Sequence, residues 1–163
     1  MRFVWMLALA ALITVSTMAK TARIGKVLQH LEDAEGRIAL QPSLYERDAY
    51  QALLRESPEK VRALRFEVNW GGVVKNTKRL TLRMEVVGAN TAPGKPAVYE
   101  QVVRNKGIFT NWSVLRVDKE AYEKLGRVVS WRATLWDGEK LIAEQKSFLW
   151  DSTPVKSTAN AAH

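Results

Sequence analysis

The sequence predicts a mainly β protein, an antiparallel immunoglobulin-like β-sandwich with a short N-terminal helix and one crossover helix. Apolar and polar residues alternate with a period of two in several segments after residue 60, as in strands with one wet face. Turn residues separate these segments at roughly ten-residue spacing, which is typical of all-β folds. The chain has no cysteine, so it lacks the cysteine pair of true immunoglobulin domains, and its core alone must hold the fold.

Residues 1–19 have the layout of a secretory signal peptide. Arg2 is followed by an apolar run, Phe3–Val15, and by small residues up to Ala19, where the cut is expected. The alternative is an uncleaved membrane anchor over residues 3–19, a stretch at the short limit for a spanning helix. We therefore expect a protein that is secreted or periplasmic after cleavage, or else held at the membrane by residues 3–19.

Residues 20–42 fit two interpretations, and both stay open. Two short apolar runs, 27–31 and 37–40, flank a polar stretch that ends in Gly36, an arrangement typical of a hairpin. A helix over residues 24–35 fits the spacing of the apolar residues nearly as well.

A helix is predicted near residues 44–56. Ser43 can cap its start, with Glu46 at capping-box spacing, and Pro58 ends it. The apolar side chains expected on its buried face are Leu44, Ala49, Ala52 and Leu53.

The rest of the chain reads as strands with one helical crossing. The predicted strands cover residues 64–70, 80–86, 97–104, 108–117, 127–136 and 140–150. The crossing helix runs from Asp118, a suitable N-cap, to Leu125, and Gly126 can end it. Asp137-Gly138 predicts a hairpin between the last two strands. Residues 20–150 are thus expected to form one domain, and the Ser-, Thr- and Ala-rich residues 151–163 a disordered tail.

The positive net charge favours anionic binding partners but does not identify one. The formal net charge is +8, and removal of Arg2 with the signal leaves 24 basic against 17 acidic residues, or +7. Such a surface attracts acidic polysaccharide, lipid headgroups or released nucleic acid. The alternative is a solvated basic surface, because lysine and arginine are scattered along the strands. The partner is therefore unknown, with a protein or polysaccharide of the cell envelope as the expectation, and no specific nucleic-acid motif is present.

Signatures of catalysis are scarce. His30 is the one plausible imidazole, because His163 ends the tail, and the chain offers too few cysteines and histidines for a zinc site. No phosphate loop or nucleophile elbow occurs, so no cofactor or metal is predicted. Glu67 and Glu85 would serve a carboxylate-dependent hydrolase if they met across a sheet. Both alternate with apolar residues, however, which favours two separate positions facing water.

Aromatic residues supply the speculative binding site. Trp70, Trp136 and Trp150 stand at the ends of predicted strands, where exposed rings would stack on sugars. The alternative is that each fills core volume. Asn111-Trp112-Ser113 matches the N-glycosylation triplet, which requires an exposed asparagine in a eukaryotic secretory route.

These observations favour an exported, non-catalytic β-sandwich that acts as an envelope or extracellular interaction module. A carbohydrate-binding module using the three rim tryptophans is the alternative, and a carboxylate-dependent hydrolase is less favoured.

Overall fold

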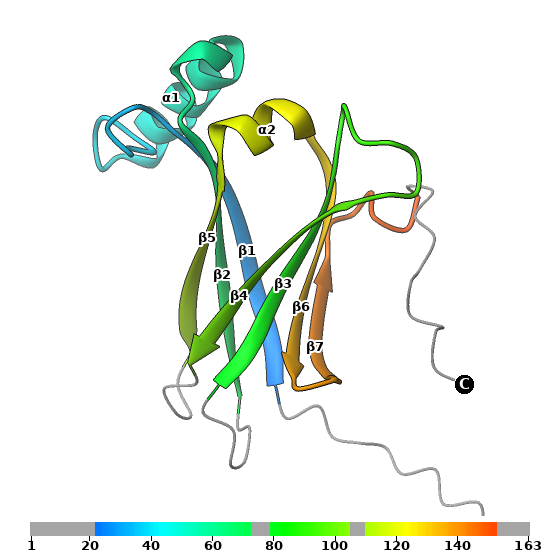
Figure 1. Cartoon of the computed structure of the whole chain (residues 1–163). Helices are drawn as coiled ribbons and strands as arrows, with labels where there is room; N and C mark the ends of the chain where they lie inside the picture. Colours follow the sequence, from blue (N-terminus) through cyan, green and yellow to red (C-terminus); the bar gives the residue numbers. More distant parts are fainter. Residues whose placement is uncertain (1–21, 73–78, 105–109, 153–163) are drawn as a thin grey trace, which may run out of the picture.

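The computed structural model describes residues 22–72, 79–104 and 110–152, and it is mainly β. Within these residues, seven strands form two antiparallel sheets, ordered β1-β2-β5 and β4-β3-β6-β7 (Figure 1). The strands are β1 Ala22–Glu32, β2 Ala63–Gly72, β3 Arg79–Gly88, β4 Ala97–Arg104, β5 Asn111–Asp118, β6 Val128–Asp137 and β7 Lys140–Lys146. The helices are α1 Leu44–Glu56, the 3₁₀ turn η1 Pro58–Lys60, and α2 Lys119–Leu125.

The predicted signal or anchor over residues 1–19 lies outside the described residues, as does the tail from residue 153 onward. Among the residues that are described, no helix is both long and apolar enough to cross a membrane.

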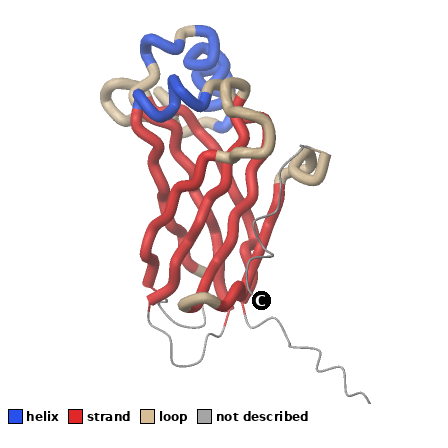
Figure 2. The backbone as a smooth tube through the Cα atoms, turned by 45° about the vertical axis from the view of Figure 1, so that its right-hand side comes forward, coloured by secondary structure: helices blue, strands red, loops and turns tan. Residues whose placement is uncertain are grey.

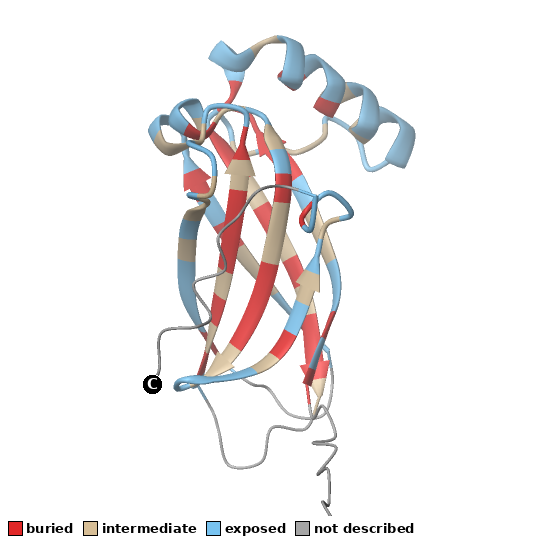
Figure 3. Cartoon of the chain, turned by 90° about the vertical axis from the view of Figure 1, so that its right-hand side faces the viewer, coloured by how far each residue is buried: buried red, intermediate tan, exposed pale blue. Residues whose placement is uncertain are grey.

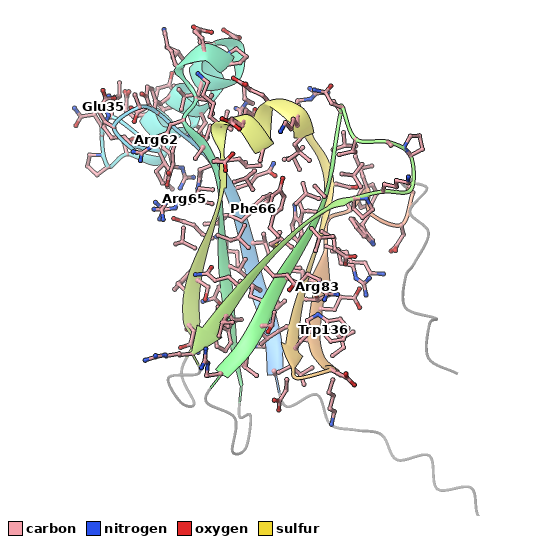
Figure 4. All side chains as sticks on the ribbon, in the orientation of Figure 1. Glu35, Arg62, Arg65, Phe66, Arg83 and Trp136 are labelled. Carbon is pink, nitrogen blue, oxygen red and sulfur yellow. The ribbon has the colours of Figure 1, made fainter. Side chains whose placement is uncertain are left out.

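The inner faces of the two sheets share one hydrophobic core. Phe66 and Val68 of β2 are fully buried in it, as are Leu82 and Met84 of β3. Figure 4 shows Phe66 between the sheets. The alternation predicted from the sequence therefore places every second side chain of the central strands inside the core.

The helices gather at one end of the strands, which we call the helical end (Figure 2). Strand β1 begins with Ala22 at the opposite end and finishes at the helical end (Figure 1). Helix α1 occupies the range in which a helix was predicted. Ser43 stands at its N-cap, but its side chain makes no capping hydrogen bond, so the predicted capping box does not form.

Residues 20–42 form neither of the two predicted arrangements in the part that is described. Residues 22–32 are one strand, β1, which pairs antiparallel with β2 through a register shift between Ile24 and Lys26. The helix prediction over residues 24–35 is therefore wrong. The hairpin prediction is also wrong, because the strand partner of β1 is β2 and not residues 37–40. Pairing with the long strand β2 gives β1 more backbone hydrogen bonds than pairing with the short segment 37–40 in a local hairpin would give.

The second half of the chain follows its local signals closely. The carboxylate of Asp118 accepts a hydrogen bond from the Ala121 amide at 2.8 Å, and Gly126 ends α2 with φ of 72°. Asp137 pairs with Lys140, which leaves a two-residue hairpin loop in which Gly138 has φ of 60°. Strand β7 is shorter than predicted, because the chain turns after Lys146.

Candidate functional site

The position of α1 is fixed by one buried polar side chain, Gln51. Its carboxamide accepts a hydrogen bond from the Leu31 amide at 2.7 Å and donates to the Leu31 carbonyl at 2.8 Å. The same amide nitrogen donates to the Ile38 carbonyl at 2.8 Å. Leu31 belongs to the edge strand β1, so Gln51 pairs with its peptide group as a neighbouring strand would. Leu54 adds a fully buried side chain one turn further along the helix.

This anchoring leaves most of the apolar side chains of α1 exposed to solvent (Figure 3). The prediction that Leu44, Ala49, Ala52 and Leu53 line the buried face is wrong, because all four are exposed. We call the resulting surface the α1 patch. It consists of Leu40 (55% exposed), Leu44 (67%), Tyr45 (79%), Leu53 (43%), Ala49 and Ala52. Four large apolar side chains on one helix and its approach segment form a concentration that soluble surfaces seldom show without a partner.

The loop between β1 and α1 is held by Asp33. Its carboxylate accepts hydrogen bonds from the Tyr50 hydroxyl at 2.6 Å and from the Arg37 side chain at 2.7 Å. The amides of Arg37 and Glu35 donate to the same carboxylate. Burial acts to raise the pKa of Asp33, but the hydrogen bonds from Tyr50 and Arg37 outweigh it and lower the pKa to about 2. The loop and the helix are therefore tied together through an ionised carboxylate.

A charged cluster covers the outer face of the three-stranded sheet near the helical end. The buried carboxylate of Glu32 accepts hydrogen bonds from Arg116 at 3.0 Å and from Arg65 at 3.2 Å. Arg65 also pairs with Glu67. Arg62 and Arg65 point away from the core on this side of the molecule (Figure 4). Because Glu32 and Glu67 neutralise part of the positive charge of these arginines, the cluster lacks the unpaired positive charge of an anion-binding site.

His30, the one imidazole with a possible chemical role, is buried beside this cluster. Its Nδ1 lies 4.0 Å from a Glu67 oxygen and makes no hydrogen bond with the described residues. Burial lowers the pKa of His30, and the charges of Arg47 and Arg65 act in the same direction against the opposing effect of Glu67. His30 borders a cavity of about 60 Å³. It is therefore a buried ring with a weakened affinity for protons rather than an accessible base.

The two carboxylates considered for hydrolysis do not meet. Glu67 lies on β2 and contacts Arg65, whereas Glu85 lies on β3 and pairs with Arg132 at 3.3 Å. The strands belong to different sheets, and both side chains alternate with core residues, so they point outward from opposite faces. The hydrolase that would use this pair has no support in the geometry.

The three predicted ligand-binding tryptophans do not share a surface. Trp70 (1% exposed) donates its indole hydrogen to Ser113 at 2.9 Å inside the core, and Trp150 (6%) is buried in the turn after β7. Trp136 is partly exposed, and the Arg83 guanidinium lies 5.1 Å from its ring centroid (Figure 4). A stacking platform of two rings from this set is not formed, because strand alternation turns Trp70 inward.

Trp112, which the sequence analysis did not place in the binding site, is 55% exposed on β5. Its neighbours in the glycosylation triplet are less available: Asn111 is buried and Ser113 is occupied by the Trp70 indole. Trp112 therefore faces outward in this triplet, whereas glycosylation requires an exposed Asn111.

Within residues 22–72, 79–104 and 110–152, no group of three or more histidine, aspartate or glutamate side chains is placed to hold a metal ion. Comparison with known proteins adds no relative: no family model matches the chain, and no curated protein matches it. The α1 patch is therefore the candidate functional site on the strength of its own geometry.

Proposed function

We propose that this chain is an exported, non-catalytic β-sandwich that works by contact, as an envelope or extracellular interaction module, and that the α1 patch is its contact surface. The observation that carries the proposal is the exposure of Tyr45 and Leu53 on the part of α1 that faces away from Gln51, whose side chain is hydrogen-bonded to the sheet. Leu44 is exposed at the border of the docked side. A rigid helix with an apolar outer face is a common form of protein-binding surface.

The sandwich follows an immunoglobulin-like plan in this proposal. Strands β1, β2 and β5 would correspond to A, B and E, and strands β3, β6 and β7 to C, F and G. Strand β4 pairs with β3 rather than with β5, which is the position of strand C′ in variable-type domains. The antiparallel pairings and the absence of cysteine fit such a module built without a disulfide.

The sugar-binding alternative receives less support. It needs two flat rings on one surface, and Trp136 alone of its three residues reaches the surface. We therefore make protein contact through the α1 patch the primary proposal.

Site-specific photo-crosslinking tests this function. A photoreactive side chain replaces Leu53 in cells that export the protein, and a second strain carries it at Leu141 of β7, which is similarly exposed (39% against 43%). We expect a discrete crosslinked product from position 53 on irradiation and none from position 141, with mass spectrometry identifying the captured chain. Equal products at both positions, or none at position 53, would contradict the proposal.

A further inference from the structure

We infer that the occupant of the α1 patch is the same patch of a second copy of this chain, packed antiparallel about a two-fold axis. This inference rests on the proposed function, because it names the partner of the same surface.

The charged border of the patch is self-complementary. At about 100° per residue, Leu44, Asp48 and Arg55 fall within about 40° of one another, along the edge of the exposed face that adjoins the docked side of α1. Ala49 and Ala52 lie nearer its middle. In an antiparallel pair related by a two-fold axis, the same edge of each helix meets its copy, with the residue order reversed. Asp48 then faces Arg55 of the partner subunit, and the symmetry repeats this contact.

Both charged groups are available for such a contact. Asp48 is exposed and contacts Arg47 of its own helix at 3.3 Å through one carboxylate oxygen. Arg55 is exposed and forms no ion pair within the described part of its own chain.

The small residues in the middle of the patch favour a helix as the occupant. Ala49 and Ala52 let two helix axes approach toward the close end of the usual range of about 8–10 Å. Leu44 and Leu53 then lie on either side of the contact, and Tyr45 covers its end in line with the two alanines. Isologous packing of this kind closes after two copies, so it gives a dimer and not a fibre.

The two terminal segments outside the described residues are poor occupants of the patch. Residues 153–163 contain a single large apolar side chain, Val155. The chain enters β1 at the end of the molecule opposite α1, and the eleven residues of β1 span about 36 Å. After a cut behind Ala19, the two residues before Ala22 reach about 7 Å. A retained Phe3–Val15 run seated on the patch would keep the protein monomeric, an outcome that the test below detects.

The dimer is expected to be weak. Helix α1 is about 20 Å long, and one helix from each copy buries less than the roughly 800 Å² per partner of a standard interface. Sedimentation equilibrium of the exported protein, purified in the form that cells produce, should show the average mass rising from one to two chains between about 1 µM and 500 µM.

Charge reversal tests the identity of the partner and the orientation of the helices. Asp48→Arg and Arg55→Asp each place like charges across the two-fold axis, so each should weaken dimerisation about tenfold. The double variant restores opposite charges and should dimerise within about threefold of wild type. Leu53→Ser should weaken the dimer in the same assay, whereas Leu141→Ser, at a similarly exposed position on β7, should leave it unchanged. Circular dichroism checks that each variant keeps its fold.

Three results would overturn the inference: a wild-type protein that stays monomeric at 500 µM, a dimer that Leu53→Ser does not weaken, or a double charge variant that is not rescued. The crosslinking experiment separates this failure from failure of the proposed function. A product of two identical chains supports both, a product with a different protein supports the function alone, and no product removes both.

Discussion

Replacement of Gln51 by alanine should release α1 from the sheet. The substitution removes three hydrogen bonds of 2.7–2.8 Å and leaves the Leu31 peptide group and the Ile38 carbonyl without these partners. Each bond contributes about 1 kcal/mol net, and unsatisfied buried groups add to the loss, so the free energy of unfolding should fall by about 2–4 kcal/mol. That is a large share of the roughly 5–15 kcal/mol that stabilises an ordinary domain.

Two measurements separate a local from a global effect. Urea unfolding followed by tryptophan fluorescence reports the global stability, since Trp70 lies in the core. Hydrogen exchange reports the opening of α1 itself, and the amides of α1 and of Leu31 should exchange much faster in the variant. Gln101→Ala is the matched control, because Gln101 is exposed on β4 and its loss should change stability by less than about 0.5 kcal/mol.

The reasoning fails if Gln51→Ala unfolds within about 0.5 kcal/mol of wild type while the exchange of the α1 amides is unchanged. Such a result would mean that the Gln51 amide does not set the orientation of α1, and the exposure of the α1 patch would need another cause. A selective loss of α1 protection without a global change would instead locate the whole effect in the docking of the helix.

Three further outcomes follow from the described residues. The pKa of Asp33 is lowered to about 2, so its contribution to stability is complete above its unfolded pKa of about 4 and is lost as the pH falls toward 2; acid titration of the unfolding free energy should show this loss, and Asp33→Asn should flatten it. Gly88→Ala should be strongly destabilising in thermal unfolding, because the new Cβ would lie 2.0 Å from the Leu125 carbonyl oxygen, and an unchanged Tm would contradict the close approach. Expression through a eukaryotic secretory route should leave Asn111 unmodified, and a glycosidase-sensitive mass shift at this residue would show that the strand opens before modification.

The strands were predictable because their signals are local. Alternation in residues 64–70 and 80–86 requires only that one face meets a core, and β2 and β3 meet that requirement. The α2 cap at Asp118 and the turn at Gly138 depend on backbone chemistry within a few residues, which the sequence displays directly. The pairing of β1 with β2 was not predictable in this way, because it joins segments separated by helix α1 and depends on which ladder is longer.

The candidate site was missed because the apolar side of a helix is normally its buried side. For α1 the buried side is instead marked by Tyr50, Gln51 and Leu54, which share one face and include a polar residue that a core would not usually accept. The only signal in the sequence was that Gln51 would need three hydrogen-bond partners if it were buried, and those partners come from β1 and from residue 38.

The orientation of α1 is informative because the opposite one looks favourable for an isolated chain. Burying a leucine side chain contributes about 1.5–3 kcal/mol, so turning Leu53 into the molecule would offer hydrophobic stabilisation of about that size. In the structure this burial does not occur. The helix is instead docked through the hydrogen bonds of Gln51 to Leu31 and of Tyr50 to Asp33. Docking through polar groups fixes the helix in one rotation, since hydrogen bonds are directional and apolar burial is not. A contact module requires an apolar surface that stays exposed in the single chain, and directional hydrogen bonds keep the α1 patch exposed. The α1 patch of a second copy would then bury the apolar side chains that remain exposed in the single chain.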